Sequence, residues 1–165
     1  MQMEINDQDF LIFIDRAFDG MSKIVMDLGQ EIANKRPALD GGNSPYAILF
    51  HCVGLTNYWV GTLIGNRSTE RDRNNEFVAT GDINSLLKSV EEIKKQIRLD
   101  LKKFNGHMPP TEIPNVAYSP MKEHEEWNQA QVLIHTYEEL AQHHGHMEIT
   151  KDILIKSQTD NLVKK

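Results

Sequence analysis

Apolar residues are spaced along the chain in a way that predicts four long helices and no strand. From Asp7 or Gln8 until Pro37 they recur every three or four residues, as on one face of a helix. The same spacing predicts a third helix over about 82–104 and a fourth over about 123–155. Proline disfavours helix in the residue before it, so the first helix should end before Pro37.

The second helix has a clear start signal at Ser44 and Pro45. The serine side chain can cap free backbone amides, and proline at the first helical position loses no hydrogen bond. No charged residue occurs from Ser44 to Gly65, a stretch long enough to span a membrane. Because it also carries His51, Asn57 and three glycines, we expect a helix buried by its neighbours and no membrane span.

Four long helices with two long polar connections predict an all-α four-helix bundle with crossover loops. One connection, 66–81, is rich in charged residues, and the other is rich in proline. The 165 residues suit one domain, which we expect over 1–158, with a flexible tail over 159–165. Bundles build sites from side chains on facing helices, so inward polar residues are the candidates for function.

Composition narrows the range of functions. Lys and Arg number 18 against 24 Asp and Glu, and without a basic cluster we expect no nucleic-acid partner. The single cysteine, Cys52, permits no intrachain disulfide and no multi-cysteine zinc site. We expect it to be a small buried apolar residue. The first ten residues lack the basic segment of a secretory signal, so we expect a cytoplasmic protein.

Three residues on two helices form a candidate metal site. His51 shares a helix face with apolar residues, and Glu139 and His143 lie one turn apart on the apolar side of the fourth helix. A His₂Glu set can hold zinc and leave one position open for water or for a thiol. The alternatives are a core histidine bonded to a backbone carbonyl and an exposed Glu–His pair. His146 lies on the same side as His143.

Five segments, spread over nearly the whole chain, carry a family pattern: 36–45, 49–54, 58–59, 71–77 and 135–148. With these segments the chain resembles the DinB-like metalloenzyme superfamily, in particular its branch of mycothiol-dependent S-transferases and maleylpyruvate isomerase-like proteins. The resemblance implies a four-helix bundle, often a homodimer, that holds a divalent metal with three side chains. Carried onto this sequence, the ligands are His51, Glu139 and His143. His146 would be a fourth ligand or a hydrogen-bonding group of the pocket.

The resemblance also implies thiol chemistry. A low-molecular-weight thiol, mycothiol or bacillithiol-like, would bind the metal and attack an electrophile, giving S-transfer or thiol-assisted isomerisation. We expect Arg71 and Arg73 of the charged loop, with Tyr58, to contact this cosubstrate; the alternative is a solvated loop. Zinc is the expected metal, although nickel or iron would fit the same ligands. A hydrolase that uses metal-bound water and a non-catalytic bundle that binds a metal or small ligand are the alternative functions.

Overall fold

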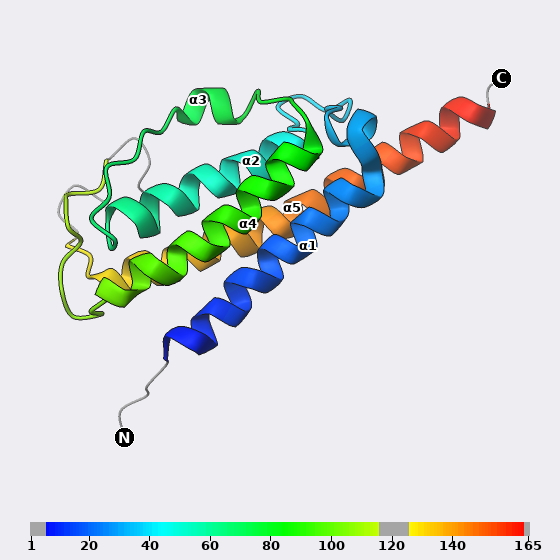
Figure 1. Ribbon diagram of the computed structural model, residues 1–165. Helices are drawn as coiled ribbons and strands as arrows, with labels where there is room; N and C mark the ends of the chain where they lie inside the picture. Colours follow the sequence, from blue (N-terminus) through cyan, green and yellow to red (C-terminus); the bar gives the residue numbers. More distant parts are fainter. Residues whose placement is uncertain (1–5, 116–125, 164–165) are drawn as a thin grey trace.

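The computed structural model describes residues 6–115 and 126–163, and in these ranges every regular element is helical. Four long helices lie side by side in a bundle (Figure 1), which confirms the predicted fold class. Helices α1 and α2 each contact the other three, so they form the centre of the packing. The long helices are α1 (Asp7–Ala33), α2 (Pro45–Thr56), α4 (Ile83–Asp100) and α5 (Gln129–Val163).

Helix α2 is enclosed by α1, α4 and α5. This explains why the sequence from Ser44 to Gly65 carries no charge, since almost every side of the helix meets another helix. Within residues 6–115 and 126–163, no helix combines the length and the apolar character needed to cross a membrane.

Three short elements were not predicted from the sequence. A π-helical segment, η1 (Asn57–Thr62), continues α2 without a break, and a 3₁₀ turn, η2 (Leu101–Lys103), follows α4. The charged connection contains a one-turn helix, α3 (Arg73–Glu76), which runs along the outside of α2 in Figure 1. Single turns such as α3 are too short to show a hydrophobic period, so spacing alone does not reveal them.

Helix α1 departs from a regular helix near its end. Gly29 has φ 68° and ψ 174°, a conformation that glycine adopts without steric cost. The end of α1 turns away from the helix axis at this point (Figure 1). A Cβ atom at position 29 would meet no other atom within 4 Å, so the backbone angle alone requires glycine.

Helix α5 differs from the prediction at both ends. The predicted start near Glu123 lies outside the described residues, and 126–128 are not helical. The helix continues past the predicted end at Ile155 to Val163, because no glycine or proline stops it and Lys156 pairs with Asp160 one turn later. Part of the expected tail is therefore helical, and residues 164–165 lie outside the description.

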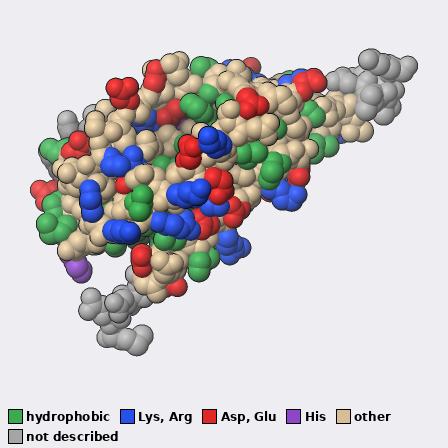
Figure 2. Space-filling view, in the orientation of Figure 1, with side chains coloured by type: hydrophobic (Ala, Val, Ile, Leu, Met, Phe, Trp, Pro, Cys, Tyr) green, Lys and Arg blue, Asp and Glu red, His purple; other side chains and the backbone are tan. Residues whose placement is uncertain are grey.

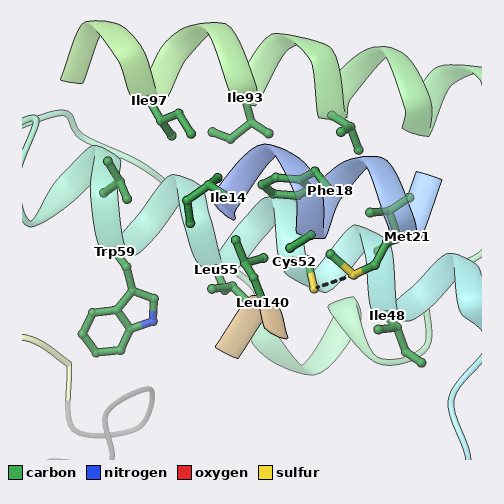
Figure 3. Packing of buried hydrophobic residues seen from close by; sticks show 14 of the residues in the cluster. Ile14, Phe18, Met21, Ile48, Cys52, Leu55, Trp59, Ile93, Ile97 and Leu140 are labelled. Atoms are coloured by element: carbon green, nitrogen blue, oxygen red, sulfur yellow. Dashed lines mark hydrogen bonds between the residues drawn. The ribbon is translucent and has the colours of Figure 1, made fainter. Parts of the chain in front are cut away.

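The core is built from apolar side chains of all four long helices, as Figure 3 shows for one part of it. In that view Leu140 of α5 lies beside Leu55 of α2, and Ile93 and Ile97 of α4 lie on the other side of the cluster. This packing holds α2 against α5, and the candidate site lies between these two helices. Fully buried members include Ile14, Phe18, Met21, Ile48, Leu55, Trp59, Ile97 and Leu140.

Candidate metal site

The three predicted ligands come together between α2 and α5. One ligand atom from each of His51, Glu139 and His143 lies within 4.8 Å of the others. The rings of His51 and His143 meet edge to face, with centroids 4.7 Å apart, and Nε2 of His143 is 3.7 Å from a carboxylate oxygen of Glu139. Packing of α2 against α5 therefore brings His51 next to Glu139 and His143, which are already neighbours on α5.

The surroundings of His51 and Glu139 favour the protonation states that a metal requires. Burial lowers the pKa of His51, so its ring stays neutral and keeps a lone pair. The neighbouring His143 ring lowers the pKa of Glu139, which keeps this carboxyl ionised. Neutral imidazole and ionised carboxylate are the forms that ligate cations.

The donor set also fits a cation in size. Zinc bonds of about 2.1 Å in a tetrahedron place ligand atoms about 3.4 Å apart. The atoms here lie within 4.8 Å of one another, so a small contraction would complete the coordination. Glu139 and His143 are half-buried and can rotate to make it, whereas His51 is 3% exposed and firmly packed.

Glu76 is a partner of His51 that sequence reasoning missed. Its Oε2 lies 2.7 Å from Nδ1 of His51, and its carboxylate accepts two hydrogen bonds from Arg71, at 2.9 and 3.0 Å. Although burial tends to raise the pKa of Glu76, the bonds from His51 and Arg71 outweigh it and lower this pKa. Among the described residues, the recorded hydrogen-bond partner of His51 is this carboxylate, whereas the alternative expected a backbone carbonyl.

The charged connection is solvated only in part, because residues 72–75 are exposed whereas Arg71 and Glu76 are not. The side chains of Arg71 and Glu76 are only 4% and 5% exposed, because the loop folds over α2. Phe77 stacks on the His51 ring with centroids 4.6 Å apart. The sequence held one weak signal for this arrangement, opposite charges five positions apart, but nothing that placed them over His51.

The residues expected to bind a thiol cosubstrate connect to His51 through Glu76 and Phe77. The guanidinium carbon of Arg71 is 5.8 Å from the ring centre of Tyr58, whose hydroxyl accepts a bond from the backbone amide of Asn115 at 2.8 Å. Arg73 is exposed, and its guanidinium lies over the Phe77 ring. The role of these three residues toward a cosubstrate stays a prediction.

Comparison with models of known families gives a match over most of the chain. A family model described as mycothiol S-transferase matches residues 9–154. The chain belongs to the mycothiol S-transferase family. This is a DinB-like family, so the resemblance inferred from the sequence segments is confirmed. Searches of curated proteins and of solved structures find no match.

Two other histidines of this mycothiol S-transferase family member lie near the three donors. His146 is exposed, its ring centroid is 6.4 Å from that of His143, and it is not part of the three-residue group. His135, which sequence reasoning overlooked, is buried one turn before Glu139 between Trp59 and Trp127. The repeat of four positions from 135 to 139 to 143 was the signal that could have found it.

Proposed function

We propose that this member of the mycothiol S-transferase family is a divalent-metal-dependent enzyme that transfers a low-molecular-weight thiol to an electrophile. The observation that carries the proposal is the convergence of His51, Glu139 and His143 within 4.8 Å. The family match supports the thiol as cosubstrate. Zinc suits two imidazoles and a carboxylate, and it leaves a fourth position open for the thiol.

A bound divalent cation supplies positive charge that favours the thiolate form of a thiol at neutral pH. The three ligands determine the net charge of the site once a cation is bound. His51 and His143 donate as neutral rings, and Glu139 contributes one negative charge, so a dication keeps a net charge of about +1. That residual charge attracts an anionic sulfur. The exposed parts of Glu139 and His143 leave this side of the site open to small molecules.

Metal binding is the first test. We expect about one zinc ion per chain in the wild-type protein, since the described residues offer one such group. His51→Ala and His143→Ala should each lose most of it. His144→Ala is the matched control, because His144 lies on the other side of α5, against Gly20 of α1. Elemental analysis after dialysis measures the occupancy, and equal metal in all three variants would contradict the site.

Turnover is the second test, and it separates the three functions considered. Zinc-loaded protein should join an added mycothiol-type thiol to a fluorogenic alkyl halide faster than buffer does, and His51→Ala should not. Ester or amide hydrolysis without any thiol would instead support a hydrolase that uses metal-bound water. Zinc binding without either activity, over a panel of thiols and electrophiles, would support a non-catalytic bundle.

A further inference from the structure

The carboxylate of Glu76 contacts Nδ1 of the His51 ring, which leaves Nε2 as the nitrogen available to a metal. A carboxylate accepts hydrogen bonds only, so Nδ1 of His51 carries the proton that it donates to Glu76 over 2.7 Å. The lone pair is then on Nε2. Histidines that ligate metals commonly donate their other N–H to a carboxylate, which fixes the tautomer and the orientation of the ring.

The carboxylate is itself held in place from two directions. Arg71 donates from Nε and Nη2 to the two oxygens of Glu76, a planar two-bond arrangement that fixes the carboxylate plane. Gly54 of α2, one turn after His51, lies against the same carboxylate. A Cβ atom at position 54 would clash with Oε1 of Glu76 and would also come within 3.0 Å of its Cδ. Glycine there allows the carboxylate to reach the helix surface.

From these contacts we infer that Glu76 is a positioning residue. Glu76 accepts hydrogen bonds from Arg71 and packs against Gly54, and it fixes the His51 ring in the tautomer that leaves Nε2 free for metal binding. The inference rests on the proposed metal site. It extends the functional site beyond the three ligands to the connection between η1 and α4, so that the folding of this loop over α2 sets the metal affinity.

The wild-type chain tests the inference without any substitution. Nitrogen-15 NMR of the histidine rings distinguishes the two neutral tautomers of His51 in the metal-free protein. We expect the proton on Nδ1, because the Glu76 carboxylate cannot donate. A proton on Nε2 would overturn the inference. This measurement does not depend on whether the protein binds a metal, so it is separate from the test of the proposed function.

Glu76→Gln tests the consequence for affinity. The amide has the shape of the carboxylate but cannot hold Arg71 and the Nδ1 proton with the same charge, so zinc affinity should fall about 10- to 100-fold. Competition with a chromophoric chelator measures the affinity. Glu70→Gln, on an exposed residue of the same loop, is the control and should bind zinc like the wild type.

Gly54→Ala provides a second variant that changes no charge. The added methyl group should displace the Glu76 carboxylate, lower zinc affinity and broaden or shift the His51 ring signals. Melting temperatures of the metal-free proteins show which variants remain folded. Wild-type affinity in a folded Glu76→Gln or Gly54→Ala variant would overturn the inference and leave the metal site standing. If the wild type bound no zinc, the proposed function would fail while the tautomer result still stood.

Discussion

Cys52 shows how strongly one helical step changes the environment of a side chain. It follows His51 directly, yet its thiol lies in the apolar core and donates a weak hydrogen bond to Sδ of Met21 at 3.7 Å (Figure 3). The residue is fully buried, as predicted, and burial raises the pKa of the Cys52 thiol. A buried neutral thiol is a poor nucleophile, which is consistent with a thiol supplied by a cosubstrate.

The reactivity of Cys52 can be measured directly. We expect Ellman's reagent to label the folded protein far more slowly than the protein in concentrated urea, because the thiol is inaccessible and protonated. The urea-unfolded chain is the control, since it contains the same single cysteine. Native labelling at the rate of the unfolded chain would show that this part of the core opens readily.

At the scale of elements, the start of α2 depends on a local signal that the sequence already showed. Oγ of Ser44 accepts a hydrogen bond from the backbone amide of Ala47 at 3.1 Å, and Pro45 occupies the first helical position. The serine is buried, so water cannot replace the bond. This cap positions the helix that carries His51.

Removing the cap should destabilise the protein. Ser44→Ala is expected to lower the free energy of unfolding by about 1 kcal/mol, because one amide of the first turn loses its acceptor. Urea denaturation followed by circular dichroism measures the change. Ser68→Ala, at an exposed loop position, is the control and should leave the unfolding free energy unchanged. A similar midpoint for both variants would mean that Ser44 contributes no capping energy.

At the scale of the whole molecule, ion pairs link α4 to α1 and to the charged connection. Figure 2 shows Lys and Arg side chains gathered over α4 with acidic side chains beside them. Lys94 of α4 pairs with Asp19 of α1 at 2.7 Å. The most buried of the pairs to α4 joins Arg67, just after η1, to Asp100 through two bonds of 2.9 Å. Gly65 leaves room for this carboxylate, which a Cβ atom would overlap.

The pair between Arg67 and Asp100 should contribute substantially to stability. Asp100→Ala leaves a partly buried guanidinium without this carboxylate, which is expected to cost about 2–3 kcal/mol. Lys88→Ala is the control, because its 3.8 Å pair with Glu92 is exposed and worth at most about 0.5 kcal/mol. Denaturant midpoints at equal slope measure both changes. Equal losses in the two variants would contradict the importance of the buried pair.

The sequence by itself indicated the four long helices, the cap of α2 and the three side chains that converge between α2 and α5. Each of these depends on neighbours within one or two helical turns, where a fixed period of 3.6 residues converts spacing into direction. That is why Glu139 and His143 could be paired, and why His51 could be placed on an inward face. The end of α5 was not determined in this way, because the helix was predicted to end at Ile155 and continues to Val163.

Only the tertiary structure shows how the charged connection, residues 66–81, packs against α2. Glu76 lies 25 positions from His51, in a segment with no period that could orient it. The position of Glu76 depends on Arg71, which donates hydrogen bonds to its carboxylate, and on Gly54, which has no side chain to clash with that carboxylate. These contacts form only when the loop and α2 are both folded, so packing in three dimensions settled the partner of His51.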